Sequence, residues 1–111
     1  FYNSFIQSHI AATFYHAYRM VTDADNIFLT SGSDNLALHR SERTFAENHL
    51  QHLDHFGFII SEMAEVDVWF QHLQQRGVKI IADPKTHRDG ARSFYCLDPD
   101  GNTVQMIYHP L

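Results

Sequence analysis

The side chains of this sequence best suited to chemistry are its histidines, of which there are nine among 111 residues, beside a single cysteine. Imidazole is the commonest metal-binding side chain and transfers protons near neutral pH. His49, His52 and His55 lie three residues apart, and on a helix they would share one face and could hold a metal ion. The apolar run at residues 56–60 favours a strand that has already begun at His55. We therefore expect His55 to act separately from the other two.

The strand that follows His55 has a clear alternation. His55 and Gly57 share one face, and Phe56, Phe58 and Ile60 share the other. The apolar face suits packing against a helix, whereas Gly57 leaves room beside His55 for a ligand or another backbone. From the residues alone, His55 either caps the beginning of the strand or points into a cleft.

Other candidate site residues lie on later and earlier strands. Gln105 shares a strand face with Thr103, and it either binds a metal weakly through its amide oxygen or hydrogen-bonds a ligand directly. Ser93 and Tyr95 share a face, and Tyr95 either offers a phenol to a substrate or fills the cleft wall. His39 faces a cleft near the end of its strand or is a solvent-exposed histidine.

These residues are positioned by two series of elements. In the first half we expect the end of a helix at residues 1–6, strands at 9–21, 27–30 and 36–40, and a polar connection at 41–51. The second half predicts a strand-helix-strand-strand-strand order over 53–108, with its helix at 61–77. The helix has an apolar stripe at i, i+3, i+4 and i+7, formed by Val66, Trp69, Phe70 and Leu73. The other elements are strands at 78–81, 92–97 and 103–108, a loop at 82–91 and a turn at 98–102.

Composition restricts the class of protein. The formal net charge is −5 and 44% of the residues are hydrophobic. Basic residues are scattered, which argues against nucleic-acid or membrane partners, and a single cysteine excludes an internal disulfide and a cysteine-based zinc cage. We expect a cytoplasmic protein with one domain over 1–111, and a gene product that extends beyond Phe1.

The second half resembles the vicinal oxygen chelate superfamily of glyoxalases, bleomycin-resistance proteins and extradiol dioxygenases. The resemblance rests on His55-Phe56-Gly57-Phe58, the helix end through Gly77-Val78, Ser93-Phe94-Tyr95 and the turn Asp98-Pro99-Asp100-Gly101-Asn102. It implies an α+β fold in which paired βαβββ modules curl around a cleft. Residues 1–50 would form an incomplete first module that lacks its first strand, and 51–111 the second.

The resemblance also implies a site. Many family members hold one divalent metal ion, such as Zn, Ni, Mn or Fe, through His near the start of each module and Glu on each last strand. Here His55 and Gln105 stand at such positions, with His39 or the absent segment completing the set, and Gln105 replaces the usual Glu. Ser93 and Tyr95 would contact the small-molecule substrate. A metal-dependent lyase, isomerase or dioxygenase is one expectation; a metal-free sequestering protein is the other. We expect a homodimer in either case.

Overall fold

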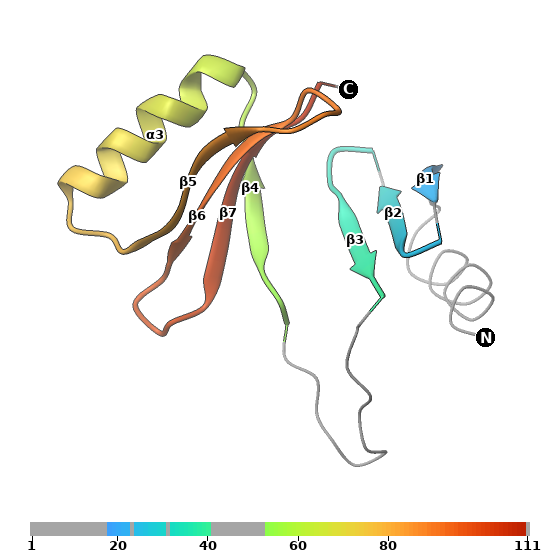
Figure 1. Ribbon diagram of the computed structural model, residues 1–111, viewed down its shortest axis with the longest axis horizontal. Helices are drawn as coiled ribbons and strands as arrows, with labels where there is room; N and C mark the ends of the chain where they lie inside the picture. The colour runs from blue at the N-terminus through green and yellow to red at the C-terminus, as the bar shows by residue number, and fades with distance from the viewer. Residues whose placement is uncertain (1–17, 23, 31, 41–52, 111) are drawn as a thin grey trace, which may run out of the picture. The chain divides into compact units, whose positions relative to one another are not determined.

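The computed structural model describes residues 18–22, 24–30, 32–40 and 53–110 (Figure 1). The chain divides into two compact units, Phe1–His49 and Leu50–Leu111, which we call the first and second units. Each is described by itself. The expected helix end at 1–6 and the polar connection at 41–51 lie outside the described residues, as do His49 and His52.

The first unit contains a three-stranded antiparallel sheet. Its strands are β1 (Tyr18–Thr22), β2 (Asn26–Thr30) and β3 (Leu36–His39), in the order β1-β2-β3. Alternation in β2 buries Ile27 and Leu29, which pack against two leucines of β3. The predicted meander of short strands is confirmed here, although only the end of the expected strand at 9–21 is described.

The second unit has the βαβββ order expected for residues 53–108. Its elements are β4 (Phe56–Ile59), α3 (Met63–Gln75), β5 (Ile80–Thr86), β6 (Arg92–Leu97) and β7 (Thr103–Tyr108). The strand order is β4-β7-β6-β5; β4 runs parallel to β7, and the other neighbours are antiparallel. Figure 1 shows α3 lying along this sheet. The fold is α+β, as predicted.

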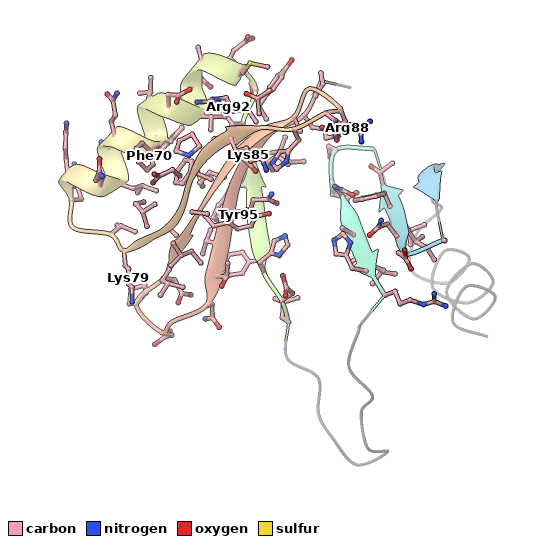
Figure 2. The ribbon with its side chains drawn as sticks, in the orientation of Figure 1. Phe70, Lys79, Lys85, Arg88, Arg92 and Tyr95 are labelled. Carbon is pink, nitrogen blue, oxygen red and sulfur yellow. The ribbon has the colours of Figure 1, made fainter. Side chains whose placement is uncertain are left out.

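The core of the second unit lies between α3 and one face of the sheet. Val66 of α3 and Phe94 of β6 are fully buried, and the rings of Phe70 and Phe94 meet edge-to-face at 5.5 Å between centroids. Phe70 extends from α3 toward the sheet (Figure 2). Cys96 belongs to the same core, and burial raises the pKa of its thiol, so it acts as a small apolar side chain, as expected.

The end of α3 follows from Gly77. This residue has φ +77°, a conformation that glycine adopts without strain, and its N–H donates to the carbonyl of Gln74. Val78 N–H donates to the carbonyl of Leu73 at 3.0 Å. These two bonds form a Schellman motif, and Leu73 and Val78 both pack against the core.

An ion pair fastens α3 to β6. The Arg92 guanidinium donates to both carboxylate oxygens of Asp67, at 2.7 and 2.8 Å, and to the Thr86 hydroxyl at 2.9 Å. The hydrogen bond from Arg92 lowers the pKa of Asp67, and its charge adds to the effect. Arg92 lies beside α3 in Figure 2.

The turn between β6 and β7 is held by Asp98. Its carboxylate accepts from the backbone N–H groups of Asp100 and Asn102 and from the Asn102 side chain, at 2.8 to 3.0 Å. These bonds lower the pKa of Asp98. Gly101 has φ +86°, and its N–H donates to the Asp98 carbonyl. The sequence predicted this turn.

Three expectations for the second unit are wrong. Trp69 belongs to the apolar stripe that was expected to pack against the sheet, but it is 43% exposed, since Val66, Phe70 and Leu73 provide the contacts of α3 with the core. Phe56 and Phe58 are 40% and 57% exposed, because β4 is an edge strand. The strand expected at 78–81 instead continues to Thr86 through two irregularities in its pairing, and Pro84 is tolerated because β5 is the other edge.

Candidate functional site

Gln105 of β7 is the centre of a group of polar side chains on the sheet face opposite α3. It is paired with Gly57 of β4 on one side and with Tyr95 of β6 on the other. Paired residues point to the same face of a sheet, so Tyr95, and Ser93 two residues earlier, share the face of Gln105. The strand phases predicted from the sequence for these residues are confirmed.

Gly57 allows the backbones of β4 and β7 to lie very close together. A Cβ atom built at Gly57 would lie 2.6 Å from the carbonyl oxygen of Gln105 and 3.0 Å from its Cβ. The space left by the missing side chain is therefore filled by the backbone of β7, one of the two occupants that the sequence allowed.

The amide of Gln105 is held by two hydroxyl groups. Its Nε2 donates to the Tyr95 hydroxyl at 2.7 Å and to the Ser93 hydroxyl at 3.3 Å. Because both bonds use the amide nitrogen, Oε1 is the atom that Gln105 offers to a ligand.

His55 lies immediately before β4 and contacts the same group. Its ring meets the Tyr95 ring edge-to-face, with 5.3 Å between centroids and 90° between planes. Its Nδ1 lies 2.6 Å from Oδ2 of the adjacent Asp54. When Nδ1 carries the proton and donates it to this carboxylate, Nε2 keeps a lone pair, which is how carboxylates orient metal-binding histidines.

The Tyr95 phenol is kept protonated. Burial raises its pKa, the negative charge of Asp54 raises it further, and the hydrogen bond from Gln105 opposes both effects. Since its oxygen accepts from Gln105, the phenol proton is available to an oxygen of a ligand.

His39 belongs to the first unit. Its Nδ1 lies 2.6 Å from Oδ1 of Asn26, and its ring meets the Phe28 ring edge-to-face at 5.9 Å. The side chain is exposed at the end of β3. The structure therefore brings together His55, Gln105, Ser93 and Tyr95, whereas His39 is described only within its own sheet.

His87 was not among the predicted site residues. It follows β5, and its Nε2 lies 3.1 Å from the Ser93 hydroxyl, which joins it to the group around Gln105. The signal that could have found it is strand phase. Lys85 is paired with Ser93, so His87, two residues further, points to the same face; the expected loop at 82–91 concealed this alternation.

The donor set tests whether a metal ion fits. His55 Nε2 and Gln105 Oε1 are an imidazole nitrogen and an amide oxygen from neighbouring strands, suited to Zn, Ni, Mn or Fe. Within residues 18–22, 24–30, 32–40 and 53–110, no group of three or more His, Cys, Asp or Glu side chains could hold a metal. The candidate donors in the second unit are therefore these two neutral side chains, His55 and Gln105.

Comparison with known proteins assigns the chain to a family. The sequence model of the Glyoxalase/Bleomycin resistance protein/Dioxygenase superfamily matches residues 4–106. The chain belongs to this superfamily. The match extends over most of the first half as well as the second half.

Two solved structures have a similar fold at low sequence identity. NAD-dependent benzaldehyde dehydrogenase from Legionella pneumophila has a TM-score of 0.63 and 15% identity, over 97% of this chain and 87% of that one. The Mn(II)-bound glyoxalase from Novosphingobium aromaticivorans has a TM-score of 0.60 and 18% identity, over 83% of this chain and 30% of that one. Lactoylglutathione lyase from Agrobacterium tumefaciens is 21% identical, with a TM-score of 0.46, over 96% and 81%.

Proposed function

We propose that this protein is a metal-dependent enzyme of the vicinal oxygen chelate type, a lyase, isomerase or dioxygenase acting on a small oxygen-rich substrate. The observation that carries the proposal is the hydrogen bonding of two neighbouring side chains. Asp54 orients His55 through Nδ1, and Ser93 and Tyr95 take the amide nitrogen of Gln105. Both residues thereby offer a ligand atom with a lone pair to the same face of the sheet.

In this proposal His55 and Gln105 hold one divalent ion. Two protein ligands leave positions open for a substrate with adjacent oxygens. The bound ion would supply Lewis-acid polarisation of a substrate oxygen. The Tyr95 hydroxyl donates a hydrogen bond to a substrate oxygen and thereby fixes the orientation of the substrate. The glyoxalase from Novosphingobium aromaticivorans binds Mn(II), which supports a divalent ion in this proposal.

A metal-free binding protein is the second candidate, and one observation favours it. Gln105 is neutral, and the hydrogen-bonded side chains around it, Ser93, Tyr95 and His87, carry no carboxylate. Such a face can hold a neutral or anionic ligand by hydrogen bonds alone. The two candidates differ in the effect of a negative charge at position 105.

Calorimetric titration of the untagged full chain with Mn²⁺, Ni²⁺ and Zn²⁺ tests the proposal. We expect His55→Ala to weaken metal binding about tenfold or more and Gln105→Glu to tighten it about tenfold, since Glu adds a charge and a stronger oxygen donor. His72→Ala, on the exposed side of α3, is the matched control. If His55→Ala binds the metal ions with unchanged affinity, the metal site is refuted and the metal-free binding protein remains. In that case Gln105→Glu should weaken binding of the small-molecule ligand.

We also expect a homodimer in the cytoplasm. A sheet with two edges is often covered by a second subunit. Light scattering should give twice the chain mass, and a monomeric mass at high micromolar concentration would exclude the dimer. Among the described residues, no helix is long and apolar enough to cross a membrane.

A further inference from the structure

Gln105 is held by two hydroxyl groups, and hydroxyl groups can hold an amide in either of two orientations. Serine and tyrosine hydroxyls both donate and accept hydrogen bonds. A half-turn of the amide would exchange Nε2 and Oε1, and both hydroxyls could then donate to Oε1. The two orientations present opposite chemistry to a ligand, because Oε1 can bind a cation and Nε2 cannot. A third group has to select between them.

His87 can make that selection through Ser93. The Ser93 hydroxyl lies 3.1 Å from Nε2 of His87 and 3.3 Å from Nε2 of Gln105. Serine has one hydroxyl proton. When Ser93 donates it to a bare His87 Nε2, its oxygen can only accept from Gln105, and only the amide nitrogen can donate. Ser93 is 2% exposed, so solvent offers its proton little alternative.

We infer that His87 is a positioning residue: through the Ser93 hydroxyl it orients the Gln105 amide so that Oε1 faces the ligand. The effect on ligand binding rests on the proposed function, in which the ligand is a metal ion that binds the oxygen atom of Gln105. It requires neutral His87 to carry its proton on Nδ1.

The hairpin between β5 and β6 holds His87 in place. The His87 N–H donates to the Ala91 carbonyl at 2.7 Å, and the Gly90 N–H donates to the His87 carbonyl at 3.0 Å. Asp89 accepts from the Ala91 N–H at 3.0 Å. Gly90 has φ +87°, which this tight loop requires. The His87 backbone is thus fixed on both sides.

Nuclear magnetic resonance of the metal-free, ¹⁵N-labelled full chain tests the orientation without any ligand. At about pH 8, long-range ¹H–¹⁵N spectra should show His87 protonated at Nδ1. His87→Leu should shift the Gln105 side-chain amide resonances, His87→Gln should restore them in part through its own acceptor oxygen, and the control His72→Leu should leave them unchanged. Protonation of His87 at Nε2, or unchanged Gln105 resonances in His87→Leu, would overturn the inference.

Titration of the same variants with Mn²⁺ measures the consequence. We expect His87→Leu to weaken binding about threefold to tenfold, because only part of the population then presents Oε1, and His87→Gln to recover part of the loss. Equal affinity of His87→Leu and the unsubstituted chain would refute the consequence for the ligand. Failure of the unsubstituted chain to bind Mn²⁺ would refute the proposed metal enzyme, while the amide spectra would still decide the role of His87.

Discussion

The two faces of the sheet in the second unit are built from alternate residues of the same strands, yet they carry opposite chemistry. On β6, Phe94 and Cys96 are buried under α3, whereas Ser93 and Tyr95 hydrogen-bond to Gln105 on the other face. One face supplies the apolar core and the other the candidate site. Substitutions at neighbouring positions of one strand should therefore have different effects. Those on the face under α3 should mainly change stability, and those on the opposite face should mainly change ligand binding.

The largest expected effect is at the centre of the helix-facing side. Phe94→Ala should lower the free energy of unfolding by about 3–5 kcal/mol, because a fully buried ring leaves a cavity. Urea denaturation followed by circular dichroism measures this. Phe58→Ala is the control, since Phe58 is 57% exposed and should cost far less. Equal losses in the two variants would contradict a core centred on Phe94.

On the opposite face, Gly57→Ala should lower the free energy of unfolding by about 1–3 kcal/mol. The new Cβ would meet the Gln105 carbonyl oxygen at 2.6 Å, so β4 and β7 must separate locally. The same substitution should displace Gln105 and so weaken ligand binding directly. Phe94→Ala, in contrast, should reduce ligand binding only by unfolding the protein. Denaturation and Mn²⁺ titration together check this, and full stability with full binding would show that the strands adjust without cost.

Trp69→Ala sharpens the boundary of the core along α3. With 43% of its surface exposed, Trp69 should contribute about 1 kcal/mol rather than the 3–5 kcal/mol of a buried aromatic residue. Urea denaturation compares it with Val66→Ala, at a fully buried position of the same helix. A loss for Trp69→Ala as large as that for Phe94→Ala would show that the indole is buried in solution.

Asp67→Asn removes the charge that pairs with Arg92 and should cost about 0.5–1 kcal/mol at neutral pH, because the Asp67 side chain is 44% exposed. Its folded-state pKa is lowered from 3.8. The stabilisation is therefore present above about pH 4 and is lost as the pH falls through the folded-state pKa. Denaturation midpoints measured from pH 2 to 7 check this, and Glu65→Gln, at an exposed position of α3, is the control. If Asp67→Asn and the unsubstituted chain have the same pH profile, the ion pair does not contribute to stability.

Alternation within single strands made much of this fold predictable. The phases of Ser93, Tyr95 and Gln105 followed from a period of two, and Gly57 was expected to leave room for a ligand or another backbone. Strand order did not follow from it. The exposure of Phe56 and Phe58 depends on β4 being an edge, and the exposure of Trp69 depends on which helical residues face the core. These are properties of tertiary packing that a local pattern does not contain.

The site was predictable to the extent that it lies within strands. His55 and Gln105 were found through strand phase and family resemblance, but their roles as ligands remain predictions. His87 was missed because a loop was expected at 82–91, whereas β5 continues through Pro84 to Thr86 along an edge of the sheet. Proline is compatible with an edge strand, and composition alone does not distinguish an edge strand from a loop.

The turn held by Asp98 also affects the chemical durability of the chain. Asp100-Gly101 is a pair of residue types that isomerises readily in flexible peptides, when the glycine backbone nitrogen attacks the aspartate side-chain carbon to form a succinimide ring. In the folded turn, that nitrogen donates its hydrogen to the Asp98 carbonyl at 3.0 Å, and its attack would break this bond. Slow ageing at Asp100 is therefore linked to opening of the turn, and isoaspartate should accumulate faster in a chain that has lost the Asp98 carboxylate.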